Sequence, residues 1–496
     1  MSSQTLILAG WDYEDLTFCQ STFKHISKNC RILSYPYTSF AKITNLEKLG
    51  IEEELSSIAI DELMAIKTLE CNQNISISSL DACDYEHVLL QLERTIHNQL
   101  PFYKKLRLIR SCISIQKAVL TRGNSANALL IFRDWPHLFS DYTLYLSAQL
   151  LGYNSFVLQP LKGFSRGFRE EWNPFDSAFY IVHNIKDRQV IPMEVLPSAI
   201  NDLTKKVFYD FICLETIDSK YTPSFRRSLS LIPKSSTRAS FELMPNHKWL
   251  KKNAHIDLRG QASLNKLHRM RLEYNNVATT LQDISEWITR NELGFIFFPL
   301  PKQPEANINP YLKNDYDPSL WISSLLKVLP NNIVVLCKEH PDTFRFSIEH
   351  CGHFLSDSSF PRYSGWYSDS LSCFGHRLKY IETRETFSNI LNSDQCLGVF
   401  TLNGSCLYDC LRIGLPIILP PQHWAVFLNN TYSLSPNSQT LKPEFTSLLT
   451  SSFEPSASIS EQKFEFLFER IIRRFDPSDP NHDTLLIDLA YLLDLV

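Results

Sequence analysis

Three features are missing from this 496-residue sequence, and each absence excludes a class of protein. No window approaches the ~18 consecutive apolar residues needed to span a bilayer. The opening MSSQTLILAGWDYEDL lacks the basic flank and long apolar stretch of a signal peptide. Basic residues do not exceed acidic ones, with 49 Lys and Arg against 53 Asp and Glu, so the charge is wrong for wrapping nucleic acid. We therefore expect a cytoplasmic protein with no nucleic-acid partner.

The twelve cysteines also lack any functional spacing. There is no CxxC pair and no Cys/His spacing typical of a zinc site, and residues such as Cys213 and Cys337 stand within apolar runs. Such cysteines are typical of reduced core residues in a cytoplasmic protein. The sequence therefore predicts neither a disulfide framework nor a metal site.

Short apolar runs alternating with helical periodicity are the main feature that is present. The length exceeds what one hydrophobic core usually supports, so two domains are expected. The runs are TLILAG, RILSY, ALLIF and SFVLQ in the first half, and GFIFFPL, NIVVLCKE, LKYIE, CLGVFT and PIILP in the second. Because buried parallel strands read as continuous apolar runs separated by helices, the pattern predicts an α/β protein with two Rossmann-like doubly wound domains.

The domain boundaries follow from changes in composition. We predict an acceptor-side domain at 1–217, an irregular connection rich in Ser, Pro and basic residues at 218–262, a nucleotide-sugar-binding domain at 263–434, and a tail with helices at 435–496. A helix is expected from about residue 263 through ISEWI, and two amphipathic helices over EQKFEFLFERIIRRF and DTLLIDLAYLLDLV. Two such domains facing a cleft suggest the GT-B arrangement of nucleotide-sugar glycosyltransferases, although other two-domain α/β families share that outline.

Polar residues follow three strands of the predicted second domain. They are Lys302, Gln303, Pro304 and Glu305 after the first strand, Lys338, Glu339, His340 and Pro341 after the second, and Leu402, Asn403, Gly404 and Ser405 after the third. Ligands of doubly wound sheets bind at the carboxyl ends of the strands. A helix beginning near Ser405 would offer free backbone N–H groups to a phosphate. These strand ends therefore predict a site for an anionic nucleotide, although Gly404 and Ser405 also suit a simple helix N-cap.

In these same residues the chain resembles the bacterial capsule polysaccharide biosynthesis proteins, a family that includes Kdo transferases. The resemblance is carried, in order, by FFPLPKQPEANINP, KEHP and TLNGSCLYDCLRIGLPIIL, within roughly residues 264–424. A looser match is the upstream segment IFRDWPHLFSDYTLYLSAQLLGYNSFVLQPLKGFSRGF. The chain departs from the family at Asp409, where a glutamate is expected, and at Leu415, where a lysine is frequent.

The resemblance implies a metal-independent GT-B transferase that uses a CMP-activated ulosonic acid such as Kdo. His340 and Pro341 would then hold the phosphate or ribose of CMP, and Lys338 would balance the phosphate charge. Asn403, Gly404 and Ser405 would bind the phosphate from the helix end, and Gln303 is a further expected nucleotide-binding residue. Release of CMP leaves a phosphate monoester, which cationic or hydrogen-bond donors can stabilise without a divalent ion.

The predicted catalytic groups come from both domains. Glu305 would face the reacting carbon or the acceptor hydroxyl, while Asp134, His137 and Asp141 would contribute from the first domain. General acid or base work needs a carboxylate or imidazole within hydrogen-bond reach of the substrate. For the aspartates and His137, a solvated turn after a strand is the competing interpretation.

The expected partners follow from the same resemblance. They are a nucleotide sugar and a glycan or lipid-linked saccharide acceptor, with no other cofactor, and peripheral association with the inner face of the cytoplasmic membrane is left open. Two alternatives remain: a GT-B transferase that uses a UDP- or GDP-sugar, and a non-catalytic glycan-binding or scaffold subunit of a capsule assembly complex. The pair His423 and Trp424 suits either base stacking or a hydrophobic plug.

Overall fold

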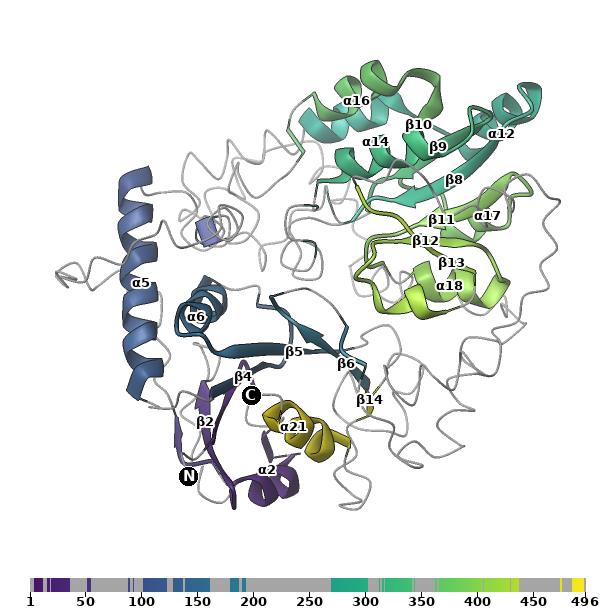
Figure 1. Ribbon diagram of the computed structural model, residues 1–496. Coiled ribbons are helices and arrows are strands. Elements are labelled where there is room, and N and C mark those ends of the chain that lie inside the picture. Colours follow the sequence, from purple (N-terminus) through teal and green to yellow (C-terminus); the bar gives the residue numbers. More distant parts are fainter. Residues whose placement is uncertain are drawn as a thin grey trace, which may run out of the picture.

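The computed structural model contains two seven-stranded sheets, each with helices on both faces (Figure 1). The structure describes residues 4–11, 16–17, 19–35, 51–54, 88–89, 92, 101–122, 128–136, 139–160, 179–186, 190–192, 269–301, 312, 315, 317–340, 343, 362–363, 365–404, 406–428, 430–436, 473–474 and 484–494. The predicted α/β class with two Rossmann-like units is confirmed by these sheets. The proposed connection at 218–262 lies outside the described residues.

The first sheet has the strand order β14-β6-β5-β4-β1-β2-β3. Its strands are β1 (Gln4–Ala9), β2 (Cys30–Tyr35), β3 (Glu53–Glu54), β4 (Ala128–Phe132), β5 (Asn154–Pro160), β6 (Phe179–Asn184) and β14 (Arg473–Arg474). Strands β1 to β5 pair in parallel, whereas β6 pairs antiparallel with both β5 and β14. The chain runs outward in one direction from β1 and in the other from β4, so the topological switch point lies between these two strands.

Alternate residues of the first sheet face two different helix layers. One layer contains α5 (Phe102–Arg122) and α6 (Phe139–Leu150), which bury Ile109 and Leu144 against Leu130. The other contains α2 (Gln20–Ile26) and the C-terminal helix α21 (Thr484–Asp494), which bury Phe23 and Leu489. Helix α6 ends just before Gly152, whose positive φ of 76° suits glycine at a helix stop.

The second sheet is parallel throughout, with the order β13-β12-β11-β8-β9-β10-β7. Its strands are β7 (Ala278–Thr279), β8 (Gly294–Pro299), β9 (Ile333–Lys338), β10 (Leu378–Ile381), β11 (Cys396–Phe400), β12 (Ile417–Leu419) and β13 (Thr431–Ser433). Strands β9 and β10 follow β8 on one side, and β12 and β13 follow β11 on the other. The switch point of this sheet therefore lies between β8 and β11.

The second sheet is also covered on both faces. Val335 and Cys337 pack with α14 (Pro318–Val328) and α16 (Trp366–Phe374). Val334 and Leu336 pack with α12 (Leu281–Arg290), α17 (Phe387–Leu391) and α18 (Cys406–Ile413). This burial on both sides explains the continuous apolar runs in the sequence. In the described part of the chain no helix combines the length and apolarity needed to cross a membrane.

Three sequence expectations were wrong or incomplete. The helix expected from residue 263 through ISEWI is interrupted by β7, after which the Thr280 side chain accepts a hydrogen bond from the Asp283 N–H and begins α12. Arg473 and Arg474, expected in a helix, form β14 because they pair with the edge of β6. The edge strands β6 and β13 were not predicted, whereas the final helix was confirmed as α21.

Candidate functional site

The three motif-bearing strands of the second unit are direct neighbours. Their order is β11-β8-β9, so TLNGS, PKQPEA and KEHP all leave the same edge of the sheet, at and beside its switch point. The backbone keeps these ends close, because the Leu300 N–H donates to the Lys338 carbonyl over 2.8 Å. The sequence placed these segments after three strands, and the sheet order brings the strands together. This edge is the candidate site.

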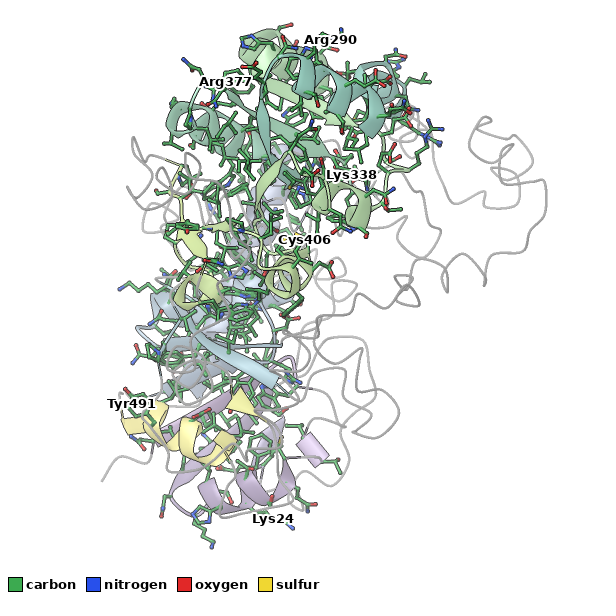
Figure 2. The ribbon with its side chains drawn as sticks, turned by 90° about the vertical axis from the view of Figure 1, so that its right-hand side faces the viewer. Lys24, Arg290, Lys338, Arg377, Cys406 and Tyr491 are labelled. Carbon is green, nitrogen blue, oxygen red and sulfur yellow. The ribbon has the colours of Figure 1, made fainter. Side chains whose placement is uncertain are left out.

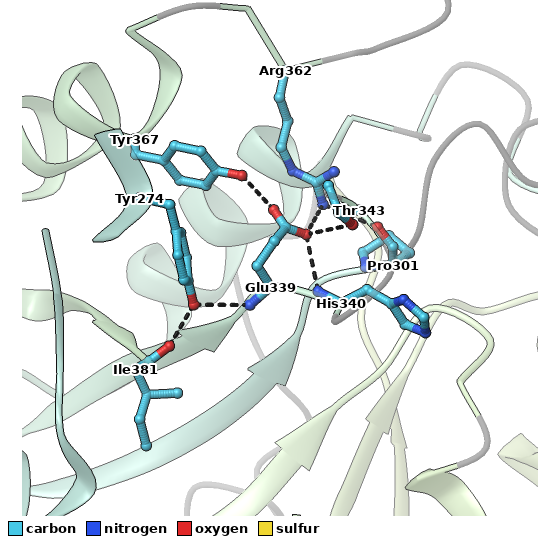
Figure 3. A network of polar contacts seen from close by, with 8 residues as sticks. All are labelled: Tyr274, Pro301, Glu339, His340, Thr343, Arg362, Tyr367 and Ile381. Carbon is cyan, nitrogen blue, oxygen red and sulfur yellow. Dashed lines mark hydrogen bonds and ion pairs between the residues drawn. The ribbon is translucent and has the colours of Figure 1, made fainter. Parts of the chain in front are cut away.

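A buried ion pair lies at the end of β9 (Figure 3). Arg362 Nη2 is 3.1 Å from Glu339 Oε1, and neither side chain is exposed. Glu339 Oε2 accepts a 2.5 Å hydrogen bond from the Tyr367 hydroxyl. Glu339 Oε1 also accepts from the His340 N–H at 3.1 Å and from Thr343 Oγ1 at 3.3 Å. The carboxylate is thus held by one cation and three hydrogen-bond donors, as a buried charge requires.

Two tyrosines extend this network across the sheet. The Glu339 N–H donates to the Tyr274 hydroxyl at 3.0 Å, and that hydroxyl in turn donates to the Ile381 carbonyl at the end of β10. Burial is the main cause that raises the pKa of Tyr274 and of Tyr367 well above the usual value, with the Glu339 charge adding to it. Both phenols therefore remain protonated and can keep donating hydrogen bonds at neutral pH.

His340 occupies the boundary between this buried network and the strand edge. Its backbone N–H is bound by Glu339, and its carbonyl accepts a 3.0 Å hydrogen bond from the Thr343 N–H. The imidazole is half-buried and points away from the Glu339 carboxylate (Figure 3). A turn fixed by one hydrogen bond to the Glu339 side chain and one between backbone groups thus directs this side chain.

Lys338 lies on the opposite face of β9 from Glu339. Its side chain is 3% exposed, and its Nζ is 5.2 Å from the centre of the Phe387 ring in α17. Burial lowers the pKa of Lys338 to about 8, although the nearby charges of Glu339 and Glu385 oppose this shift. Within the described residues no carboxylate comes within 4 Å of this amine. Lys338 is therefore a cation that an anionic ligand would stabilise.

The turn between β11 and α18 is built around Thr401. The Gly404 N–H donates to Thr401 Oγ1 at 2.9 Å, and a Cβ added to Gly404 would lie 2.9 Å from that same oxygen. A larger residue at this position would have to displace the Thr401 side chain, so the turn favours glycine. Asn403 is half-buried and Gly404 is exposed, and α18 begins at Cys406. The predicted order of strand, turn and helix is confirmed.

Both predicted catalytic aspartates lie near the switch point of the first sheet. Asp134 follows β4, and its Oδ1 accepts a 2.8 Å hydrogen bond from the Trp135 N–H. Asp141 lies in the first turn of α6 and is 3% exposed. Asp134 is also buried and shapes the turn after β4, so a solvated turn is the wrong interpretation for both aspartates, and their catalytic roles stay predictions.

Several predicted site residues lie outside the described residues. They are Gln303, Glu305, His137, Pro341 and Ser405. For the pair after β12, both His423 and Trp424 are buried, and burial lowers the pKa of His423 to about 3. The hydrophobic plug is therefore the interpretation that agrees with the structure. Among the described residues no group of three or more His, Cys, Asp or Glu side chains is placed to hold a metal ion.

Sequence reasoning missed Tyr274, Arg362 and Tyr367 as members of the site. Arg362 reaches Pro301, 61 positions earlier, through a 3.0 Å hydrogen bond from Nη2 to the carbonyl oxygen. Tyr274 reaches Glu339, 65 positions later. No local pattern marks such contacts, and an arginine in the stretch PRYSG has the appearance of an ordinary polar loop residue.

Comparison with known proteins gives distant likenesses only. No protein-family model matches the chain, and no curated protein matches it. Among solved structures, it is similar to a UDP-GlcNAc 2-epimerase from Methanocaldococcus jannaschii, with 10% identity, a TM-score of 0.24, and 98% of this chain and 99% of that chain covered. It is also similar to a UDP-GlcNAc 2-epimerase from Neisseria meningitidis bound to UDP-GlcNAc, with 11% identity, a TM-score of 0.23, and 99% and 100% covered. A third similar structure is a trehalose-6-phosphate synthase, with 9% identity, a TM-score of 0.26, and 99% of both chains covered. Likenesses at these TM-scores assign neither a family nor an activity.

Proposed function

We propose that this chain is a GT-B glycosyltransferase that binds a nucleotide sugar at the carboxyl edge of its second sheet. One observation carries the proposal: PKQPEA, KEHP and TLNGS follow the adjacent strands β8, β9 and β11, at and beside the switch point. That edge is where doubly wound sheets bind their ligands. It also carries a buried amine, a half-buried imidazole and the beginning of a helix.

The donor in this proposal is a CMP-activated ulosonic acid such as Kdo, and the acceptor is a glycan or lipid-linked saccharide of a bacterial surface polysaccharide. Support for this finer assignment comes from the order of the three motifs, which resembles capsule polysaccharide biosynthesis proteins. Lys338 and the amino end of α18 would stabilise the phosphate of the leaving CMP, and no divalent ion would be needed. Acceptor binding would take place on the side of the first unit, near Asp134 and Asp141, with peripheral contact to the inner face of the cytoplasmic membrane.

A nucleotide screen tests the proposal. The purified full chain is titrated with CMP, UDP and GDP without metal, while its thermal unfolding is followed. A ligand that binds only the folded state must raise the apparent stability. We expect CMP to stabilise the wild type, His340→Ala to lose most of that effect, and His376→Ala to keep it, because His376 is an exposed histidine in the turn before β10.

Each other outcome has a defined meaning. Stabilisation by UDP or GDP in place of CMP would change the donor and keep the site. Equal stabilisation of both histidine variants would contradict the assignment of His340. Stabilisation by none of the three nucleotides would favour the non-catalytic scaffold.

A further inference from the structure

The buried network at the candidate site joins the ends of three neighbouring strands. Arg362 Nη2 binds the Pro301 carbonyl just after β8, Glu339 follows β9, and the Tyr274 hydroxyl donates to the Ile381 carbonyl at the end of β10. We call Tyr274, Glu339, Arg362 and Tyr367 the strand-end clamp. All four side chains are fully buried, so the clamp holds these strand ends from inside the protein.

The central ion pair of the clamp is a costly choice for stability alone. Replacing a buried ion pair by packed apolar side chains is frequently neutral or stabilising. In the described part of the chain, Nε and Nη1 of Arg362 are also buried without a hydrogen-bond partner. An incompletely satisfied buried cation adds to the cost. The arrangement is therefore better explained by the geometry that it imposes than by stability.

That geometry concerns two motifs at once. Arg362 binds the carbonyl of Pro301, the residue directly before KQPEA. Its partner Glu339 binds the backbone N–H of His340, the third residue of KEHP. One ion pair thus connects the starting points of both segments. A displacement of either partner would move the Pro301 carbonyl or the His340 backbone.

Arg377 provides a comparison at the opposite end of the same strand. Its guanidinium donates to the carbonyls of Leu326, Leu329, Pro330 and Ile333, over 2.8 to 3.1 Å, where β9 begins. Ile333, which Arg377 binds, and Lys338 are the first and last residues of β9, and Figure 2 shows Arg377 and Lys338 apart from one another in the second unit. Arg377 therefore ties loops and strand together like Arg362, but it lies far from the motif-bearing edge.

We propose that Glu339 and Arg362 are positioning residues for the nucleotide site, and that Tyr367 and Tyr274 keep them in place. This inference rests on the proposed function for its ligand, because it takes a nucleotide to be the molecule that His340 contacts. The clamp residues themselves do not touch the nucleotide. They hold the backbone of Pro301 and His340 in place, which lowers the conformational entropy that nucleotide binding must remove.

Two variants and one control test the inference in the free protein. Tyr367→Phe removes the hydrogen bond to Glu339 Oε2 but keeps the ring, and Glu339→Gln removes the charge that pairs with Arg362. We expect both to accelerate backbone hydrogen exchange at the ends of β8 and β9, around residues 300 and 340. Arg377→Lys should accelerate exchange at the beginning of β9 instead. Because Tyr367→Phe leaves the ion pair in place, it keeps the test usable if Glu339→Gln does not fold.

A second measurement is the affinity for the nucleotide selected by the CMP, UDP and GDP screen, taken by calorimetry well below the melting temperature. We expect Tyr367→Phe and Glu339→Gln each to raise the Kd for the nucleotide by about tenfold or more. Arg377→Lys should lower the melting temperature but leave the Kd within about twofold of the wild-type value. A purely structural role would lower the melting temperature in all three variants and change Kd in none.

The two proposals fail in different ways. Unchanged exchange around residues 300 and 340 in both clamp variants would overturn the strand-end clamp, whatever binds. Unchanged Kd in both would overturn the positioning role. If no nucleotide binds the wild type while exchange at the strand ends still increases in the variants, the clamp fixes the strand ends but positions no nucleotide. In that case the proposed function and its nucleotide are wrong.

Discussion

At the scale of the residue, Lys338 is the side chain with the clearest conflict between stability and function. Its pKa falls from 10.5 to about 8 because burial disfavours the charged form. At pH 7 the folded protein therefore carries a destabilising buried charge. We expect Lys338→Met to raise the free energy of unfolding by on the order of 1–3 kcal/mol at pH 7. The same variant should weaken binding of an anionic nucleotide.

The pH dependence of this effect has a defined sign. Between about pH 8 and 10.5 the unfolded chain binds a proton at Lys338 that the folded chain does not bind. Stability of the wild type relative to Lys338→Met should therefore rise with pH across this window. Urea unfolding of both proteins at pH 7 and pH 9.5 measures the difference. An advantage of Lys338→Met that is equal at both values would contradict the assigned pKa.

Nucleotide affinity should respond to the same titration in the opposite way. An anion favours the protonated amine, so the affinity of the wild type should fall as the pH rises above about 8. Lys338→Met, which has no amine at this position, should show a flatter profile over the same range. Calorimetric titrations between pH 7 and pH 9.5 provide the comparison, and parallel profiles of the two proteins would place the nucleotide away from Lys338.

At the scale of the element, α21 belongs to the first unit although it is the last helix of the chain. The Tyr180 hydroxyl on β6 donates to Asp488 Oδ2 at 2.6 Å, and the Gln4 side-chain amide donates to the Leu493 carbonyl at 2.9 Å. Leu489 is fully buried with residues of β1 and α2. The final helix therefore completes the hydrophobic core beside the first sheet, which contains the N-terminal strand β1.

We expect Leu489→Ala to destabilise the first unit by about 2–5 kcal/mol, since it leaves a cavity in a well-packed core. Leu320→Ala is a suitable control because Leu320 in α14 is 43% exposed, and its cost should be within about 0.5 kcal/mol. Urea unfolding measures both changes, and hydrogen exchange in β1 and β2 locates the effect. A change in stability of Leu489→Ala no larger than that of the control would show that α21 does not contribute to this core.

The elements were predictable where the sequence itself carries the signal. ALLIF and NIVVLC are continuous apolar runs, and burial on both faces of a parallel sheet dictates such runs. Strand β14 has no such signal, because Arg473 and Arg474 are extended only through pairing with β6. The break before α12 occurs within a stretch of helical periodicity because Ala278 and Thr279 pair with β10, after which Thr280 caps the new helix. Tertiary pairing decided these two cases.

The candidate site was predictable to a similar degree. Lys338, His340 and Gly404 could be placed at or after strand ends from their positions alone, and the sheet order then made these strands neighbours. The ion pair of Glu339 with Arg362 could not be foreseen, since 23 positions and no recurring pattern separate the two residues. The sequence thus indicates which strand ends carry polar groups. Only the fold shows which of these groups are buried and hold the backbone in place.

At the scale of the whole molecule, the central claim is that a nucleotide binds the carboxyl edge of the second sheet. Hydrogen exchange of the full chain, with and without the nucleotide chosen by the screen, tests it most directly. We predict slower exchange around residues 299–301, 338–340 and 401–404, and no change at the beginnings of β8 and β9. Protection confined to the first unit, or at the amino ends of the strands, would contradict the claim.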